Sequence, residues 1–538
     1  MTTPDDPLAV DLRAAGMVGG LARALLDGDA RDLVEPLRFL EPGTLPIGEP
    51  PAVDRTEVAR GLATANAAYG HPLARELAAK LADPATRVVA TGQQTGVVGG
   101  PLLGYVKAAA AVRYAAALEA RGEPAVAIFW MATEDHDWDE IARAGFLGRK
   151  GLAELRLGPD PQPLVPVGLR TVGAGIGPFL ETLRSLYATP WSAAALERLT
   201  ALWRPDARFG EAFARQMVDA FGARSPLLVD ALLPELKRAE RPHLARLVEA
   251  RAELERGFAC RERRLGQRGF ALQVAPQPGA SPLFLLRGDG RRRIEWRGEE
   301  RYALRGTTGD APVAELLATV AENPAVVSPG ALARPAIQDA VFGTHLQVMG
   351  PGELGYLAQA AAAYEVLGLA APWTSLRPSA LVLPAKQRRR LAALGLPLAE
   401  LLADPAAAER RLGERRGGEF VAPVAAEIER LAAALDAPAR ELDPGLERPH
   451  RKTLRTIDRA LDRFAGKAAR AALRRDAEAR QRFDALVAGC LPGGRPQERV
   501  LAAAHFTLRY GAGFGRALLD GLGADPRRLW LVDPEEPA

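Results

Sequence analysis

Two short apolar runs on either side of a helix-like segment constrain the fold of this chain most strongly. The runs are RVVAT, from residue 87, and PAVAIFWMA, from residue 124, with PLLGYVKAAAAVRYAAALEARG between them. The second run is apolar throughout, which is typical of a strand covered on both faces. The segment between them opens with Pro and closes with Gly, as helices often do. Strand, helix and strand at this spacing predict a βαβ unit with parallel strands and a right-handed crossover.

The α/β pattern returns beyond residue 320, in AVVSPGALARPAIQDAVFG, HLQVMGPGELGYLAQAAAAYEVLG and APWTSLR. Between the two α/β parts, a long helix-like stretch precedes the strand-like runs FALQVAP, PLFLLRGDG, RRIEWRG and RYALRG, which we interpret as an inserted segment at about residues 235–310. Beyond residue 384 the composition favours long helices, and DAPARELDPGLERPH is expected to join two of them into an antiparallel hairpin. We expect a helical N-terminal part of the core (1–85), an α/β core (86–383), a helical domain (384–490) and a helical tail that packs back on the core (491–538).

Composition excludes several classes of protein. The two cysteines, Cys260 and Cys490, form no C-x-x-C motif, which excludes thiolate zinc sites and dithiol redox motifs. The sequence has no membrane-length apolar run and no recognisable secretion signal, so we expect a cytoplasmic protein without membrane contact. Lys+Arg 70 against Asp+Glu 66, with mixed signs and no basic block rich in aromatics, argues against a nucleic-acid partner.

Polar clusters follow the predicted strands at their carboxyl ends. The clusters are TGQQTGVVGG, TEDHDWDE, SPGALARP, GPGELGY and SLRPS. Because ligands of open parallel sheets bind at this edge, we expect the clusters to converge on one pocket.

The loop TGQQTGVVGG is rich in residues that permit close approach. Gly92, Gly96, Gly99 and Gly100 would let backbone N–H groups face an anionic ligand at the start of the next helix, and Gln93 and Gln94 would add amide groups. The alternative is a Gly-rich turn that only packs around a helix.

One lysine follows this loop in a chain whose cations are mostly arginine. Lys107 lies two turns into the helix, where a compact ammonium could be required; a chance surface position is the alternative.

The stretch EDHD places Glu134, Asp135, His136 and Asp137 together. A carboxylate beside an imidazole suits general base catalysis near neutral pH, so we expect His136 to be the base and to be oriented by Asp135 or Asp137. The same groups could hold a divalent metal, or could simply cap the next helix.

Three charged residues in the later α/β part are flanked by apolar sequence. Arg334 and Arg377 could clamp a carboxylate, with Glu353 nearby, and buried ion pairs are the alternative.

Five segments together resemble a known family. VVATGQQTGVVGGPLLGYVK, AIFWMATEDHDWDEI, SPGALARPAIQD, GPGELGYLAQ and LPGGRPQER occur in this order. They resemble the bacillithiol biosynthesis cysteine-adding enzymes, a family of cysteine ligases, over most of the chain from about residue 87.

The resemblance implies an α/β fold with a Rossmann-like, nucleotidyltransferase-type core, inserted connecting segments and a C-terminal α-helical coiled-coil domain that forms a homodimer. It also implies the last step of bacillithiol synthesis, in which the carboxyl of cysteine is joined to the amine of glucosaminyl-malate. The quoted motifs place the catalytic candidates at Glu134, Asp135, His136 and Asp137, and the substrate-binding candidates at Thr91, Gly92, Gln93, Gln94, Thr95, Gly99, Gly100, Lys107, Ser328, Arg334, Gln338, Asp339, Gly350, Glu353, Tyr356, Gln359 and Arg377.

Amide formation from a free carboxylate requires activation, so ATP or another adenine nucleotide is the expected co-substrate, and no metal is predicted. The loop TGQQTG lacks the H-x-G-H element with which related amino-acid-activating enzymes bind ATP. The family also binds an adenine nucleotide outside the main pocket, for which the candidates are Gln497 and Arg499. The alternatives are a ligase of the same fold with another amine or amino acid, and a non-catalytic ligand-binding coiled-coil protein.

Overall fold

The computed structural model describes residues 10–148, 150–275, 277–288, 290–298, 300–417 and 422–535. Expectations for residues 1–9 and 536–538 lie outside this part of the chain. The chain folds into two compact units. One contains Gly16–Val382 with the segment from Arg495 onward, and the other contains Leu383–Gly494 with the described residues up to Ala15.

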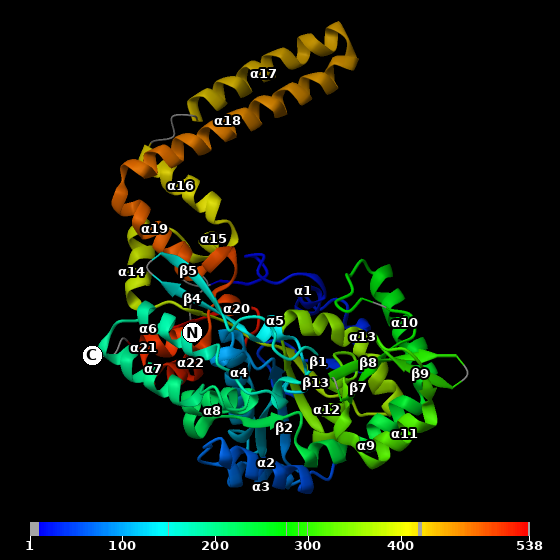
Figure 1. Cartoon of the computed structure of the whole chain (residues 1–538). Coiled ribbons are helices and arrows are strands. Elements are labelled where there is room, and N and C mark those ends of the chain that lie inside the picture. Colours follow the sequence, from blue (N-terminus) through cyan, green and yellow to red (C-terminus); the bar gives the residue numbers. More distant parts are fainter. Residues whose placement is uncertain are drawn as a thin grey trace. The chain divides into compact units, whose positions relative to one another are not determined.

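A six-stranded sheet forms the centre of the first unit (Figure 1). Its strands follow the order β1-β13-β12-β2-β3-β6, and every neighbouring pair is parallel. The βαβ unit predicted from the sequence is therefore confirmed. The bounds are β1 (Arg38–Phe39), β2 (Arg87–Gln93), β3 (Ala125–Met131), β6 (Leu227–Asp230), β12 (Thr344–Met349) and β13 (Trp373–Leu376).

Apolar residues alternate between the two faces of this sheet, and each face is covered by helices. Phe129 of β3 packs in a cluster with α4 (Leu102–Glu119) and α8 (Phe209–Phe221). Ile128, the preceding residue, packs in a second cluster with the other helices. A strand buried on both faces explains why PAVAIFWMA has no polar alternation. The second face is covered by α2 (Thr56–Ala68), α3 (Ala74–Ala82), α9 (Pro234–Glu249) and α12 (Arg334–Phe342).

The inserted segment forms a second, five-stranded sheet with antiparallel pairs. Its strands are β7 (Ala280–Arg287), β8 (Gly290–Arg297), β9 (Arg301–Leu304), β10 (Ala311–Pro312) and β11 (Val327–Pro329). Two expectations were wrong here. The described residues of FALQVAP form no strand, and β11, which includes the first two residues of SPGALARP, pairs with β7 rather than joining the parallel sheet. A short apolar run has the same periodicity in either sheet, so its partner could not be inferred from the sequence.

Several further elements complete this unit. The hairpin of β4 (Arg143–Gly148) and β5 (Gly151–Arg156) was not predicted, and the tail contains a strand, β15 (Leu529–Val532), parallel to β14 (Ser379–Val382). The long helix expected after residue 234 is divided near Ala250. The remaining helices are α1 (Gly20–Leu26), α5 (Trp138–Ile141), α6 (Ile176–Leu186), α7 (Pro190–Leu202), α10 (Arg251–Gln267), α11 (Val313–Glu322), α13 (Pro351–Leu367), α20 (Gln497–Val500), α21 (Ala503–Tyr510) and α22 (Phe514–Gly521).

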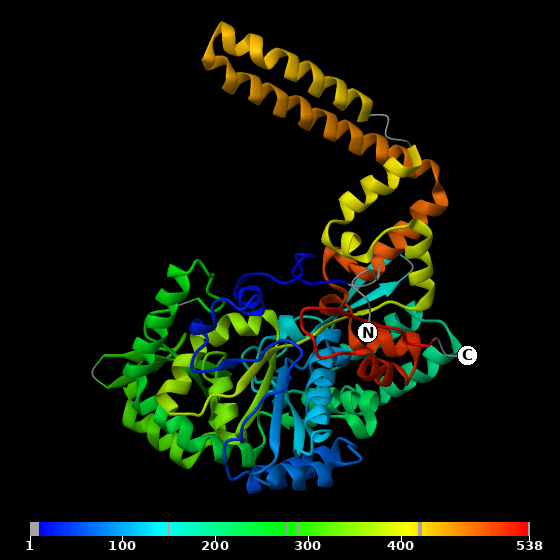
Figure 2. The ribbon, with the colours of Figure 1, turned by 180° about the vertical axis from the view of Figure 1, so that it is seen from behind.

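The second unit is helical. The helices α17 (Ala422–Leu442) and α18 (Glu447–Arg475) lie side by side in Figures 1 and 2. The predicted antiparallel pair is thus present, but α17 continues through Pro438, which shortens the expected connection. Pro438 is exposed, so water can bond the carbonyl that a proline leaves free. The other helices are α14 (Ala385–Leu394), α15 (Leu398–Ala403), α16 (Pro405–Gly417) and α19 (Ala477–Cys490); among the described helices, none is long and apolar enough to span a membrane.

The open edge of the parallel sheet at β6 is completed by a side chain. Asn66 is fully buried, accepts a hydrogen bond from Leu228 N–H (2.8 Å) and donates to the carbonyls of Leu228 and Leu62 (both 3.0 Å). Asn66→Ala should lower the free energy of unfolding by about 3 kcal/mol, because buried backbone groups lose their partners. Urea denaturation measures this, with the exposed Asn323→Ala as the matched control, expected within about 0.5 kcal/mol of the unsubstituted protein. Equal stability of the two variants would contradict the prediction.

Candidate active site

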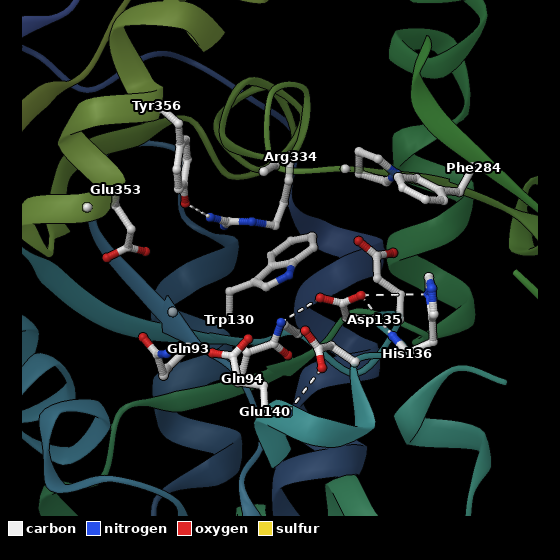
Figure 3. Close-up of a pocket in the computed structure, with 18 of the residues that line it drawn as sticks. Gln93, Gln94, Trp130, Asp135, His136, Glu140, Phe284, Arg334, Glu353 and Tyr356 are labelled. Carbon is white, nitrogen blue, oxygen red and sulfur yellow. Dashed lines mark hydrogen bonds and ion pairs between the residues drawn. The ribbon is translucent and has the colours of Figure 1, made fainter. Parts of the chain in front are cut away.

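A cavity of about 1140 Å³ lies at the carboxyl edge of the parallel sheet (Figure 3). Gln94 follows β2, His136 follows β3 and Glu353 follows β12, and all three line it. The convergence predicted from the polar clusters is therefore confirmed. Of the candidates, the lining includes Gly92, Gln93, Gln94, Lys107, Glu134, Asp135, His136, Asp137, Arg334, Gly350, Glu353, Tyr356, Arg377 and Arg499.

Lys107 connects several of the residues that line this cavity. It is buried, and its ammonium donates to the carbonyl of Gly92 (2.7 Å) and to Oε1 of Gln93 (2.8 Å), and also forms an ion pair with Glu353. Burial lowers the pKa of Lys107, while the charge of Glu353 opposes this shift. Three contacts from one compact cation explain why a lysine stands here in an arginine-rich chain. The alternative of a chance surface position is excluded.

Glu353 connects this ammonium to the start of α13. Its carboxylate accepts a hydrogen bond from Gly350 N–H (2.6 Å), which caps the helix. Burial alone would raise the pKa of Glu353, but Lys107 and the Gly350 N–H outweigh it and hold the pKa below its ordinary value. The carboxylate is consequently ionised and fixed in position.

Arg334 lies beside Tyr356 in the cavity (Figure 3). Its guanidinium donates to the hydroxyl of Tyr356 (3.1 Å) and to Oε1 of Gln338 (3.4 Å). Burial raises the pKa of Tyr356 to about 12, so the phenol stays neutral. Arg334 makes no ion pair among the described residues and can therefore receive an anionic group of a ligand.

His136 is oriented differently from the sequence-based expectation. Nδ1 lies 3.4 Å from Nη1 of Arg291 and 3.8 Å from Oδ1 of Asp135. Because a guanidinium can only donate, this contact makes Nδ1 an acceptor and places the ring proton on Nε2. Burial lowers the pKa of His136, and the charge of Arg291 lowers it further. The imidazole is therefore neutral near neutral pH.

Asp135 contacts two other polar groups of the cavity. It accepts from Nε2 of Gln94 (2.5 Å) and lies 3.4 Å from Nη1 of Arg291. Asp135 thus links the loops after β2 and β3 to the antiparallel sheet.

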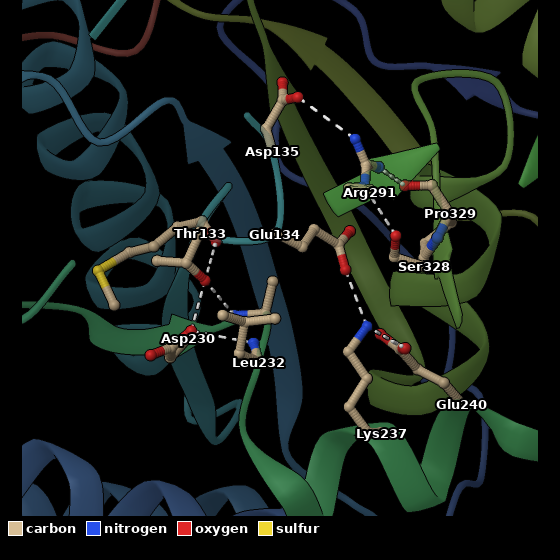
Figure 4. Close-up of polar contacts among 12 residues, drawn as sticks. Thr133, Glu134, Asp135, Asp230, Leu232, Lys237, Glu240, Arg291, Ser328 and Pro329 are labelled. Carbon is tan, nitrogen blue, oxygen red and sulfur yellow. Dashed lines mark hydrogen bonds and ion pairs between the residues drawn. The ribbon is translucent and has the colours of Figure 1, made fainter. Parts of the chain in front are cut away.

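The two other carboxylates of EDHD, those of Glu134 and Asp137, have different partners. Asp137 accepts from Glu140 N–H (3.1 Å) and caps α5, which is the capping role considered as an alternative for EDHD. Glu134 is buried and accepts from Nζ of Lys237 (2.8 Å), which also donates to Glu240 (2.9 Å; Figure 4). Over the described ranges, no group of three or more His, Cys, Asp or Glu residues could hold a metal ion. The alternative of a metal site formed by EDHD is not supported by this geometry.

Part of the Gly-rich loop packs instead of facing the cavity. Gly99 has φ +89°, and a Cβ there would lie 2.7 Å from Nε2 of Gln216. The first N–H of α4, at Leu102, donates to the carbonyl of Leu501 (2.9 Å), so a backbone group rather than an anion occupies it. The alternative of a packing turn applies to this half of the loop. Thr95, Gly99 and Gly100 are buried outside the cavity lining, and the hydroxyl of Thr91 donates to the carbonyl of Val348 (2.8 Å).

Other candidate residues lie outside the cavity lining and bond to neighbouring parts of the protein. Asp339 accepts from Gln338 (3.3 Å) and from the hydroxyl of Tyr364 (2.5 Å), and burial raises its pKa to about 6. Gln359 bonds to the backbone of Val274 (3.0 and 3.2 Å). None of Gln338, Asp339, Gln359, Ser328 and Gln497 belongs to the cavity lining.

Arg377 combines both of the possibilities considered for it. It lines the cavity, and its Nη2 donates to Glu498 of α20 (2.6 Å) in a buried ion pair. The neighbouring Gln497 bonds to the backbone of Val382 (2.9 and 3.2 Å). The side-chain amide of Gln497 therefore holds α20 against the end of β14.

Sequence reasoning missed one whole wall of the cavity. Arg291, Arg292 and Arg293 line it from β8, and Arg305 lines it from the position after β9. The run RRR at the start of a strand was the only available signal, and it gave no indication that the strand would face the pocket.

Two family models match the chain. "Bacillithiol biosynthesis BshC, N-terminal Rossmann-like domain" matches residues 47–378, and "Bacillithiol biosynthesis BshC, C-terminal coiled-coil domain" matches residues 380–523. The chain belongs to the bacillithiol biosynthesis BshC family. This confirms the resemblance, the Rossmann-like core and the coiled-coil domain that the sequence motifs implied.

Individual relatives in the BshC family extend over most of the chain. A protein of Koribacter versatilis is 30% identical over 453 residues, covering 81% of this chain and 82% of the relative. Proteins of Solibacter usitatus (29% over 452 residues; 82% and 84%) and Thermus thermophilus (30% over 449 residues; 80% and 85%) are similar. All three are named "Putative cysteine ligase BshC".

The buried Glu134–Lys237–Glu240 cluster predicts a pH-dependent stability. Burial raises the pKa of Glu240 to about 7, against the opposing charge of Lys237. A raised carboxyl pKa contributes stability that is present at low pH and is lost as the pH rises through about 7. Between pH 5 and pH 8, the protein should therefore lose up to about 3 kcal/mol relative to Glu240→Gln, at about 1.4 kcal/mol per pKa unit.

Urea denaturation at several pH values measures this difference. The control is Glu249→Gln, at an exposed position of the same helix, whose difference from the unsubstituted protein should not change with pH. A pH-independent difference for Glu240→Gln would show that the carboxyl is not perturbed.

Proposed function

We propose that this protein is a cysteine ligase that joins the carboxyl of cysteine to the amine of glucosaminyl-malate, in the last step of bacillithiol synthesis. The observation that carries the proposal is the cavity, which combines a neutral imidazole with cationic side chains suited to carboxylates. Family membership and the names of the relatives support the same assignment.

The described contacts suggest a division of roles in the cavity. His136 would take the proton of the attacking amine, since its imidazole is neutral near pH 7. Arg291 holds the ring through Nδ1, so the proton transfer requires the ring to turn or to change tautomer. Arg334 would hold a substrate carboxylate, because its guanidinium has no carboxylate partner among the described residues.

The energy for amide formation has to come from a co-substrate. ATP would supply activation of the cysteine carboxylate when bound. The cationic groups lining the cavity fit phosphate oxygens, whereas the start of α4 does not, because Leu102 N–H is already bonded to Leu501. Another adenine nucleotide in place of ATP, or another amine in place of glucosaminyl-malate, would appear in the assay below as a different substrate requirement.

Replacement of His136 tests the catalytic role. With cysteine, glucosaminyl-malate and ATP, His136→Gln should lower kcat by about 100-fold, the usual contribution of a general base. In the unsubstituted protein, kcat/KM should fall only below about pH 6.5, because the pKa of His136 lies under its ordinary value. Mass spectrometry of the thiol product measures the rate, and His243→Gln on α9, outside the cavity lining, is the control. An unchanged kcat for His136→Gln would refute the role; no product from the unsubstituted protein would refute the function.

We further propose that the coiled coil forms a homodimer. On α17, Val424, Leu431, Leu435 and Leu442 are exposed and recur at intervals that place them along one side of the helix. Leu431→Glu with Leu435→Glu should convert a dimer to a monomer, as measured by light scattering after size exclusion. Ala433→Glu, exposed on a different side of α17, should leave the dimer intact. A monomeric unsubstituted protein would exclude the proposal.

A further inference from the structure

Arginine side chains of the antiparallel sheet form one wall of the cavity. We define the arginine wall as Arg291 and Arg293 of β8 with Arg305, which follows β9; all three line the cavity. Residues two apart on a strand share a face, so Arg291 and Arg293 point to the same side of the sheet. Arg305 is held beside them, because its N–H donates to the carbonyl of Arg293 (2.9 Å).

A phenylalanine fixes the spacing of two of these guanidinium groups. Phe284 of β7 pairs in register with Arg293. The Cζ atom of Arg291 lies 3.8 Å from the centroid of its ring, and that of Arg293 lies 5.2 Å away. One aromatic ring therefore attracts both cations and holds them close together before any ligand binds. Figure 3 shows Phe284 beside His136 at the rim of the candidate site.

The wall is also fixed at the backbone. Arg291 N–H donates to the carbonyl of Leu164 (2.8 Å), and Leu164 itself lines the cavity. The preceding Gly290 has φ +147°, and a Cβ there would lie 2.5 Å from the Cβ of Leu164. The close approach of these two segments requires glycine, and it sets where β8 meets the pocket.

Carboxylates of the protein compensate the charges of the wall only in part. The buried Arg291 has one carboxylate contact, with Asp135 at 3.4 Å, and its Nε donates to Ser328 (2.8 Å; Figure 4). Arg293 donates to Oε1 of Gln277 (3.3 Å) and has no ion pair in the described part of the chain. Arg305 is paired with Glu295 (2.8 Å).

The guanidinium groups of the arginine wall repel one another, and an anionic ligand can reduce this repulsion. Burial lowers the pKa of Arg293, and the charges of Arg305 and Arg291 lower it further. Guanidinium groups remain charged in proteins, so the lowered pKa reflects the cost of burying this charge and, to a smaller extent, its repulsion by Arg305 and Arg291. An anion between them would relieve this repulsion, and a ligand with two or more negative charges would do so most effectively.

We propose that the arginine wall is a subsite for the multiply charged anionic part of a substrate, either a dicarboxylate or a phosphate chain. The proposal rests on the proposed ligase function for its placement within a reaction, and it assigns the class of ligand that this side of the cavity accepts. Both sources share one chemistry, in which several anionic oxygens meet preset guanidinium groups.

Calorimetric titration of the full chain tests the subsite. The probes are malate, inorganic pyrophosphate and, as a singly charged anion, acetate. Arg293→Gln should weaken binding of malate, of pyrophosphate or of both by about tenfold, corresponding to one lost charge-assisted contact, and should leave acetate nearly unaffected. The matched control is Arg297→Gln, which lies on the same strand and outside the cavity lining, and its affinities should equal those of the unsubstituted protein.

A second substitution separates spacing from charge. Phe284→Leu keeps every arginine but removes the ring that holds Arg291 and Arg293, so the same anion should bind several-fold more weakly than to the unsubstituted protein. Thermal melting confirms that each variant is folded. The inference is overturned if neither polyanion binds, if Arg293→Gln binds both as tightly as the unsubstituted protein, or if Arg297→Gln weakens binding equally.

The two probes also identify the source of the anion. Preference for malate assigns the wall to the dicarboxylate of the acceptor, and preference for pyrophosphate assigns it to a phosphate-bearing co-substrate. Binding that depends on Arg293 without any ligase product would keep this inference and refute the proposed function. Product formation that is insensitive to Arg293, with polyanion affinity also unchanged, would do the reverse.

Discussion

The candidate site depends on one buried ammonium group. Lys107 projects from α4 into the carboxyl edge of the sheet, where it bonds to the last two residues of β2 and to Glu353 at the start of α13. Two of these contacts are with β2 and one is with α13, so a single charge on α4 fixes the relative positions of three elements. Because the cation is buried, losing its partners would leave an uncompensated charge, and this makes the arrangement rigid.

Further charged groups extend outward from this centre. Arg334 is held by Tyr356, Arg377 is anchored by Glu498, and Arg291 reaches from the second sheet to Asp135 and His136. Few of these interactions are local in sequence. The polar lining is therefore a network in which carboxylates position cations and leave part of their donor capacity for a ligand. The donor groups that remain available on these cations suit the cavity to ligands with carboxylates, and the neutral imidazole of His136 suits it to proton transfer from amines.

The candidate site could be located from the sequence largely because of the parallel sheet. Once the βαβ unit is recognised, polar loops at strand ends must meet at one edge, and Gln94, His136 and Glu353 do meet there. The individual roles were harder to infer. Gly99 and Gly100 were expected to face a ligand but pack against neighbouring residues, since glycine serves close packing as readily as ligand approach. His136 was expected to be oriented by a neighbouring carboxylate, whereas Arg291, which is distant in the sequence, contacts its Nδ1.

The sequence by itself determined the α/β core, the helical hairpin and the family, because strand and helix periodicities and contiguous motifs are local properties of the chain. It also determined which loops carry polar groups to the edge of the sheet. Only the tertiary structure decided that β11 joins the antiparallel sheet, that Lys107 is a buried ion-pair centre, and that Arg291, Arg293 and Arg305 form a wall of the cavity. These features arise from pairing between segments far apart in the chain, and no local pattern of residues specifies which strand or charge will be the partner.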